Sequence, residues 1–423
     1  MPNFLKNETS RIFFALFLGV IFGAIMKLLP PSSYLDDVLV NGILRLVGNG
    51  FIELIKMTVV PLIFTSIICG VSSFGDSKKL GKIGAKTLTL FLITTLIGVI
   101  ISLFLAMLFK PGYVENPAMS AEISSNANQN SKNFFDVIID MIPNNPFKSM
   151  SEGNLLQVLI FASFFGIAIG KIGEKSKKVV DMFNLINECI MKIVSMIIKI
   201  TPFGVFALVS IAMYSTGLES LVGVLKLSMV VISALLVQVF LVYGLFYKIG
   251  TGFSFFSFLK NYSKIASIAF STSSSNACLP YGMHMMEKIG VDKSIYQFIL
   301  TLGSTINMAG TAIMQSASVI FISQLHGIEL PLNSIVKIVS TSVLASMGAA
   351  GVPGVGIIML TMVVSSIGLP TDGIAMIMGF DRILDMLRTP VNVMGDCVCS
   401  IIVAKSENSV DMTKFNSESR NTK

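Results

Sequence analysis

Five polar side chains recur along one face of the last apolar segment of the chain. Asp381, Asp385, Arg388, Asn392 and Asp396 follow one another at steps of four, three, four and four residues, the spacing of a single helix face. Ionisable groups at membrane depth are costly, so they normally face a cavity, a partner or a transported ion. A row that contains both positive and negative side chains suits a solute that carries both charges. A polar contact between packed helices would show the same spacing.

The residue types indicate how such a solute would be held. Arg388 presents a planar fork of donors that fits a carboxylate. Asp385, one turn earlier on the same face, can pair with an ammonium group, and Thr389 and Asn392 add neutral donors and acceptors. Together these groups match an amino acid, and the arginine also suits a second carboxylate on its side chain.

Two further acids complete the row. Asp396 is suited to a hard cation such as sodium, which favours oxygen ligands. Asp381 is expected to be structural, paired with Arg382 or with a hydroxyl group. The sequence shows no nucleophile–base pattern, phosphate loop or metal-ligand cluster, so we do not expect an enzyme. The net charge of +7 does not indicate nucleic-acid binding, because the lysines cluster in short loops beside apolar segments.

Composition indicates the environment in which these residues lie. Of the 423 residues, 53% are hydrophobic and 13% are charged, whereas an ordinary soluble domain has about 25% charged residues. The mean hydropathy is +0.78. The apolar segments are continuous rather than alternating, which favours helices over a membrane β-barrel. We therefore predict an all-α integral membrane protein, in which the five cysteines are buried side chains rather than disulfides.

The apolar segments and the lysines predict a topology. Spans are expected at residues 12–29, 51–73, 87–109, 155–170, 193–213 and 227–247, before the broken segments of the C-terminal half. Lysine clusters at 78–86 and 171–178 mark cytoplasmic loops of a protein in the cytoplasmic (inner) membrane, with both termini in the cytoplasm. The polar tail, 406–423, is expected to be disordered.

Three apolar segments in the C-terminal half are interrupted at mid-length. The interruptions are a serine run at 271–276, the sequence Asn-Met-Ala-Gly-Thr at 307–311, and a glycine- and proline-rich run at 348–356. Unwound backbone at membrane depth is tolerated only where it is buried or lines a cavity. We expect the first and third segments to be re-entrant hairpins whose tips meet near the charged row. Half-helix N-termini there can bind a carboxylate, and freed carbonyls can hold a cation.

The chain resembles the dicarboxylate/amino acid:cation symporters, the glutamate transporter family, over nearly its whole length. The motifs that carry the resemblance are the segment 381–396, the tips at 273–280 and 351–354, the break at 307–311, and the upstream motifs at 56–62, 142–147 and 202–206. Each motif alone is moderately specific, and the ordered set is strongly so.

The resemblance implies a homotrimer with an elevator fold. Each protomer would be a single membrane domain, 1–405, with eight transmembrane helices and two re-entrant helical hairpins, at about 256–289 and 334–367. Spans 1, 2, 4 and 5 (about 10–75 and 133–215) would form a fixed scaffold. Spans 3, 6, 7 and 8 with both hairpins (about 82–110 and 220–405) would carry the solute. The implied activity is secondary active transport, with sodium entry driving uptake of aspartate or glutamate.

The resemblance also assigns residues to sites. Substrate contacts are implied for Ser274, Ser275, Thr311, Val352, Gly356, Asp385, Arg388, Thr389 and Asn392. The first sodium site would use Gly303, Asn307, Asn392 and Asp396. The second would use Thr305, Met308, Ser346, Met347 and Ala349. Thr94 and Thr95 would be the remnant of a third sodium site. The sodium ions would be transported, and would not act as catalytic cofactors.

Four positions depart from the family pattern. Ala309 stands where the family usually has an aspartate of the third sodium site, so we expect that site to be weak or absent and fewer ions to be coupled. Ser273 and Met386 stand where many members place an arginine, and Pro390 is atypical beside the binding residues. Proton coupling, and transport of neutral or sulphur-containing amino acids or C4-dicarboxylates, stay open as alternatives. So do an anion channel and a solute sensor.

Overall fold

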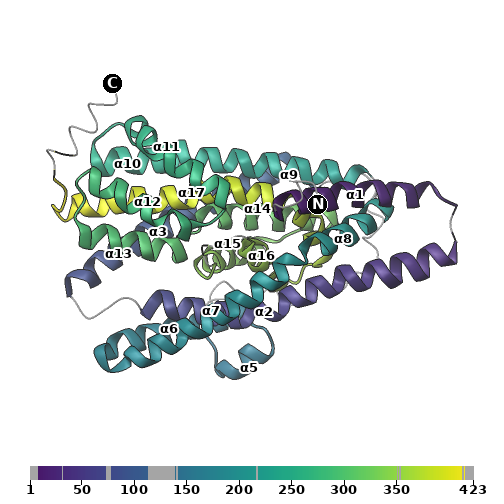
Figure 1. Cartoon of the computed structure of the whole chain (residues 1–423), viewed down its shortest axis with the longest axis horizontal. Helices are drawn as coiled ribbons and strands as arrows, with labels where there is room; N and C mark the ends of the chain where they lie inside the picture. The colour runs from purple at the N-terminus through teal and green to yellow at the C-terminus, as the bar shows by residue number, and fades with distance from the viewer. Residues whose placement is uncertain are drawn as a thin grey trace.

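The computed structural model describes residues 8–411 and 414, except for 31, 73–77, 113–138, 140–141, 216–217, 350, 352–353 and 412–413. These residues are overwhelmingly helical (Figure 1). Within the described ranges there is no strand, and an isolated antiparallel bridge joins Val291 to Val410. The all-α architecture predicted from composition is confirmed.

One bundle forms around α2. Its elements are α1 (Glu8–Leu28), the π-helix η2 (Tyr34–Leu44), α2 (Arg45–Ser72), α5 (Pro146–Ser151), α6 (Leu155–Ile172), the 3-10 helix η3 (Gly173–Ser176), α7 (Lys177–Lys199) and α8 (Thr201–Ser215). Helix α2 packs against α6, α7 and α8, and α1 packs against α8. Helices α2, α6 and α7 run along the lower edge of Figure 1. We call this set the α2 bundle.

A second set of helices surrounds the last helix, and we call it the α17 bundle. Its elements are α3 (Lys78–Phe109), α9 (Leu218–Val237), the π-helix η4 (Gln238–Tyr243), α10 (Gly244–Thr251), α11 (Phe255–Thr272), α12 (Ser275–Lys288), α13 (Lys293–Ile306), α14 (Ala309–Leu325), α15 (Leu332–Met347), α16 (Val355–Ile367) and α17 (Asp372–Ser406). Helices α14 and α17 pack against each other and lie between α9 and the pair α15–α16 (Figure 1). The polar row of α17 is therefore at the centre of this bundle.

The three predicted interruptions are present as breaks between helices. Ser273 adopts a left-handed conformation (φ 51°) after α11, and the Ser274 hydroxyl caps α12 by accepting from Ala277 N–H. Gly354, with φ 82°, precedes α16. Asn307 lies in non-helical backbone between α13 and α14. Because α11 packs on α12 and α15 on α16, two of the breaks are the turns of helix pairs.

Among the described residues, four helical segments are long and apolar enough to cross a membrane, or five if one bent pair counts as a span. The four are Lys82–Phe109, Val222–Thr251, Lys293–Leu325 and Met376–Ser406. Two further apolar stretches among the described residues, Phe14–Leu28 in α1 and Val60–Cys69 in α2, lie within predicted spans. The predicted span at 193–213 is divided between α7 and α8.

The segment after α17 folds back onto its own bundle. The Asp292 N–H donates to the Ser409 carbonyl at 3.0 Å, and the Asp411 N–H donates to the Gly290 carbonyl at 2.8 Å. Residues 406–411, the beginning of the predicted disordered tail, are therefore part of the packed structure. Most of the remaining tail lies outside the described residues.

Two charged side chains attach the same end of α17 to neighbouring helices. Glu407 forms ion pairs with Lys86 and, at 3.5 Å, with Lys82, both on α3. Lys405 donates to the Thr251 carbonyl at the end of α10. The hydrogen bond from Lys86, with the charge of Lys82, lowers the pKa of Glu407 from its ordinary value of 4.5. We call this set of contacts the C-terminal clasp.

The lowered pKa of Glu407 predicts a pH-dependent contribution to stability. The ionised carboxylate stabilises the fold above its unfolded-state pKa, and this contribution is lost as the pH falls through the folded-state value. Glu407→Gln should therefore lower the unfolding temperature of the detergent-purified protein at pH 7, and the difference from wild type should close below about pH 4. Glu329→Gln, at an exposed acid with no ion pair among the described residues, is the control. A difference independent of pH would contradict the assignment.

Candidate functional site

Arg388 is the centre of a buried group of charges. Its side chain is fully enclosed, with 0% exposure. Nη1 lies 2.9 Å from Asp381 Oδ1, Nη2 lies 3.1 Å from Asp385 Oδ1, and Nε donates to that same Asp385 oxygen at 3.2 Å. The sequence predicts Arg382 or a hydroxyl as the partner of Asp381, whereas its ion pair is with Arg388. The two residues are seven apart on α17, two turns along one face, and the long arginine side chain spans that distance.

The start of α16 lies directly against this charge cluster. The Gly354 N–H donates to Asp385 Oδ2 at 3.1 Å. A Cβ on Gly356 would lie 2.6 Å from Arg388 Nη2, so the guanidinium contacts the backbone there. Gln315 Nε2 of α14 donates to the Gly356 carbonyl at 3.4 Å. The donors suited to a solute carboxylate, a guanidinium and a helix N-terminus, are thus both bound to Asp385 in this structure.

The neutral residues predicted for the substrate site lie around the same point. The Thr389 hydroxyl donates to the Asp385 carbonyl of its own helix at 2.8 Å. Asn392 Oδ1 accepts from the Gly310 N–H at 2.7 Å, at the start of α14. Thr311 follows Gly310 and is buried. The structure therefore brings the first turn of α14 against the polar face of α17.

The tips of the two broken helix pairs touch. The Ser274 hydroxyl donates to the Gly351 carbonyl at 2.9 Å. A Cβ on Gly351 would lie 2.3 Å from the Ser304 carbonyl oxygen and 3.0 Å from Ser275 Cβ, so only glycine fits between these segments. Ser274 and Ser275 are therefore at the junction of the tips. Val352, the other tip residue predicted to contact substrate, lies outside the described residues.

Asp396 is a buried carboxylate that has no ion pair among the described residues. Its Oδ1 accepts from Asn307 Nδ2 at 2.8 Å. A Cβ on Gly303 would lie 2.3 Å from that oxygen, so the carboxylate packs against the α13 backbone. Asn392 is one turn earlier on α17. The four residues predicted for the first sodium site thus converge, and their one formal charge is negative and uncompensated.

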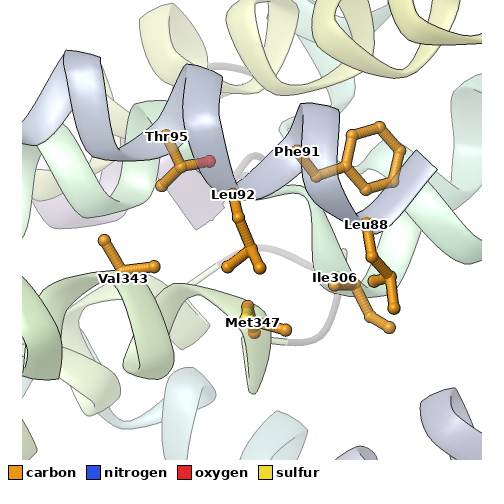
Figure 2. A pocket seen from close by; sticks show the side chains of 7 residues that line it. All are labelled: Leu88, Phe91, Leu92, Thr95, Ile306, Val343 and Met347. Atoms are coloured by element: carbon orange, nitrogen blue, oxygen red, sulfur yellow. The ribbon is translucent and has the colours of Figure 1, made fainter. Parts of the chain in front are cut away.

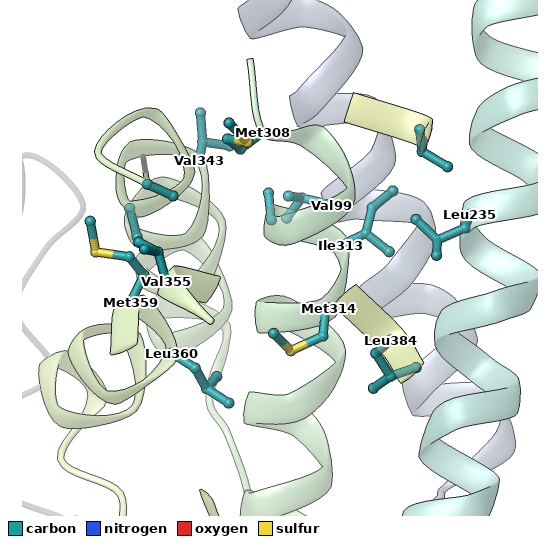
Figure 3. Packing of buried hydrophobic residues seen from close by; sticks show 14 of the residues in the cluster. Val99, Leu235, Met308, Ile313, Met314, Val343, Val355, Met359, Leu360 and Leu384 are labelled. Atoms are coloured by element: carbon teal, nitrogen blue, oxygen red, sulfur yellow. The ribbon is translucent and has the colours of Figure 1, made fainter. Parts of the chain in front are cut away.

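The residues predicted for the second sodium site surround the end of α15. The hydroxyls of Thr305 and Ser346 donate to carbonyls of their own helices, at 2.9 and 2.7 Å. Met308 belongs to the apolar cluster that joins α14 to α15 and α16 (Figure 3). Ala349 and Met347 lie where α15 ends, which is where helix carbonyls lack intrahelical partners. Carbonyl oxygens, rather than side chains, are the available ligands.

Thr94 and Thr95 face different surroundings. The Thr94 hydroxyl donates to the Leu90 carbonyl at 2.9 Å. Thr95 lines a cavity of about 10 Å³ between α3, α13 and α15, where its neighbours are apolar and include Met347 (Figure 2). Ala309 is fully buried and supplies no side-chain oxygen. The position predicted as a remnant of a third sodium site therefore has no carboxylate of its own.

Two polar residues near this site were missed from the sequence. Gln238 and Tyr243 belong to the segment interpreted as an uninterrupted apolar span, and both are 0% exposed. A buried amide within a membrane segment was the signal, because polar groups there normally have a function or a partner. Pro390, which the sequence marked as atypical, does not interrupt α17. Its carbonyl accepts from the Tyr262 hydroxyl at 2.6 Å.

An all-helical apolar chain with interrupted helices around a buried group of opposite charges has the features of a membrane transport protein. Residues 9–406 match the model of the Sodium:dicarboxylate symporter family. The chain belongs to this family. It is accordingly a cation-coupled secondary transporter that binds a small-molecule substrate.

Curated relatives cover almost the full length of the chain. It is 35% identical over 404 residues to the proton/sodium-glutamate symport protein of Geobacillus stearothermophilus, covering 94% of each chain. It is 33% identical over 423 residues to the proton/glutamate-aspartate symporter of Escherichia coli (strain K12), covering 98% of this chain and 96% of that one. It is 32% identical over 414 residues to the C4-dicarboxylate transport protein of Bacillus subtilis (strain 168), covering 97% and 96%.

The Asp381–Arg388 ion pair predicts non-additive stability effects. Asp381→Asn and Arg388→Met should each lower the unfolding temperature, because each leaves a buried charge less well compensated. The double variant should lose less stability than the two single variants lose together, and the difference should be about 1 kcal/mol or more. Arg388→Met combined with Glu407→Gln, about 28 Å further along α17, should be additive. Additivity of the first pair would show that the two side chains do not interact.

Proposed function

We propose that this protein couples sodium entry to uptake of an acidic amino acid, aspartate or glutamate. The observation that carries the proposal is the buried Arg388, which lies between Asp385 and the backbone at Gly356. An acidic amino acid has two carboxylates and an ammonium group. Arg388 and the N-terminus of α16 offer sites for carboxylates, and Asp385 offers one for the ammonium.

In this proposal the substrate replaces contacts that the protein makes with itself. The substrate ammonium would replace the Gly354 N–H as the partner of Asp385. A substrate carboxylate would replace Asp385 as the partner of Arg388 Nη2. Arg388 would keep its ion pair with Asp381. The remaining proposed contacts come from the tips and the first turn of α14, and they are Ser274, Ser275, Thr311, Val352, Gly356, Thr389 and Asn392.

Sodium is proposed because Asp396 needs a positive partner. A buried carboxylate without one is strongly unfavourable, and a sodium ion bound with the carbonyls of Gly303, Asn307 and Asn392 would supply it. A second ion is proposed at the end of α15, where carbonyls are the available ligands. With Ala309 in place of an acid, we propose that the site beside Thr94 and Thr95 is weak, so that two ions rather than three are coupled.

We further propose an elevator mechanism in a homotrimer of the cytoplasmic membrane. The division of the chain into an α2 bundle and an α17 bundle supports it, because the substrate residues all belong to the α17 bundle. In this arrangement the protomer has eight spans, and the pairs α11–α12 and α15–α16 are re-entrant hairpins. Both termini are placed in the cytoplasm by the lysine-rich loops.

Transport of a C4-dicarboxylate is the second candidate, since several relatives, including the one from Bacillus subtilis, carry that name. Such a solute has no ammonium group, so Asp385 would lose its contacts without gaining a partner. Asp385 therefore discriminates between the two classes. In a competition experiment, Asp385→Asn should weaken the ability of added aspartate to inhibit uptake of the labelled substrate. It should affect the inhibition by added succinate far less.

The proposal is tested by uptake into liposomes that contain the purified protein, with sodium, potassium or proton gradients imposed in turn. Radiolabelled aspartate, glutamate, succinate and serine are compared. Aspartate or glutamate accumulated above equilibrium by a sodium gradient, at two ions per solute, is the expected result. Accumulation of succinate or serine alone, or accumulation driven only by protons, would overturn it. Equilibration without accumulation would indicate a channel.

The close approach of Gly356 to Arg388 predicts a selective loss of transport. Gly356→Ala places a Cβ 2.6 Å from Nη2, so the guanidinium must move away from the tip. Misplacing a binding group by about 1 Å can cost on the order of a hundredfold, and we expect a loss of that size in aspartate uptake. Gly50→Ala, on α2 with no atom within 4 Å of the added Cβ, should leave uptake unchanged. Equal effects of both variants would exclude the contact as the cause.

A further inference from the structure

Pro390 removes one hydrogen bond from the interior of α17. Proline has no backbone N–H, so the Met386 carbonyl four residues earlier loses its donor within the helix, and the proline ring crowds that carbonyl. Helix α17 nevertheless continues past the proline. The weakened turn lies between Arg388 and Asn392. It therefore separates the ion-paired part of the polar row from the part that includes Asp396.

A tyrosine of α11 binds the backbone at this proline. The Tyr262 hydroxyl donates to the Pro390 carbonyl at 2.6 Å, and Tyr262 is 1% exposed. On a helix with 3.6 residues per turn, Pro390 points about 160° away from both Arg388 and Asn392. Helix α11 packs on α17 and lies above it in Figure 1, whereas α15 and α16 lie below. Tyr262 therefore holds α17 on the side opposite the polar row.

The ring of Tyr262 is held in turn by other aromatic side chains. It stacks on Phe258, with ring centroids 5.6 Å apart and an interplanar angle of 10°. Phe258 stacks on Phe255 at 5.7 Å and contacts Tyr247 of α10 at 5.1 Å. A residue that supports a binding site is effective when packing fixes its own rotamer. The aromatic stack meets this condition, because it presents the hydroxyl to Pro390 from a fixed position.

The place of the acceptor gives this hydrogen bond a role beyond satisfying a buried hydroxyl. Pro390 is the single proline of α17 and directly follows Thr389. The Thr389 hydroxyl donates within its own helix, to the Asp385 carbonyl, whereas the Tyr262 hydroxyl joins two helices. A bond between helices at the weakest turn restrains that turn. Displacing binding groups by about 1 Å can cost on the order of a hundredfold, so the restraint matters for binding.

We propose that Tyr262 is a positioning residue for the substrate site. Its hydroxyl, bound to the Pro390 carbonyl, fixes the turn between Arg388 and Asn392, and so sets the relative positions of their side chains. Tyr262 acts through α17, and substrate does not touch it. The inference rests on the proposed function, in which Arg388 and Asn392 contact the substrate.

The test separates substrate affinity from transport rate and from stability. Tyr262→Phe keeps the aromatic ring and removes only the hydroxyl. In liposomes that contain the full-length protein, we expect the half-saturating aspartate concentration to rise about tenfold, the effect of losing one well-placed hydrogen bond. The maximal uptake rate should stay near that of wild type. The unfolding temperature without substrate should fall no further than that of Tyr247→Phe.

Tyr247→Phe is the matched control, because Tyr247 is also buried and contacts the same Phe258 ring, but from α10. It should leave the half-saturating concentration unchanged. Pro390→Ala tests the route of the effect, since alanine restores the missing N–H of α17. In that background Tyr262→Phe should raise the half-saturating concentration much less. Equal rises in both backgrounds would overturn the proposal. So would a wild-type half-saturating concentration in Tyr262→Phe, whatever its unfolding temperature.

The wild-type protein distinguishes failure of this inference from failure of the proposed function. If wild type accumulates serine or succinate and not an acidic amino acid, the proposed function fails. The half-saturating concentration of the accumulated solute then replaces that of aspartate in the same comparison. A rise in Tyr262→Phe would still support the positioning role, and the absence of a rise would overturn it.

Discussion

The charge of Arg388 is the constraint on which the interior of this protein depends. A guanidinium enclosed among apolar helices has to be paired, and Asp381 and Asp385 pair it from two turns of the same helix. Two carboxylates and one guanidinium leave a net negative charge, which the Gly354 N–H partly offsets. The tip of α16 contacts both sides of this group, through the Gly354 N–H on Asp385 and through the backbone at Gly356 against Arg388.

Charged side chains in this interior lie opposite glycines, which leave room for them because they have no side chain. Gly356 gives room to Arg388, Gly303 gives room to Asp396, and Gly351 allows the tips to meet. Polar groups thereby reach backbone N–H and carbonyl groups directly in a buried region, where hydrogen bonds are electrostatically stronger than in water. Any of these glycines could be read in the sequence only as a helix breaker. The structure shows that several instead bring backbone to within contact of a charge.

Much of the architecture was predictable because it depends on local chemistry. The serine run and the glycine–proline run disfavour helix, and the breaks after Thr272 and before Val355 lie there. The polar row on α17 also follows directly from spacing. The partner of Asp381 was not predictable, because helix spacing allows several pairings along α17. The π-turn at Gln238 was missed since its apolar sequence is equally compatible with a regular helix.

The C-terminal clasp has a consequence for observing the protein at work. The end of α17 is bound to three neighbouring elements. Lys405 contacts α10, Glu407 contacts α3, and the segment 409–411 contacts the α12–α13 turn. All of these belong to the bundle that carries the polar row. A spectroscopic label attached within residues 408–411 would therefore report the position of that bundle relative to the α2 bundle, without any alteration to the residues proposed to hold solute or ions.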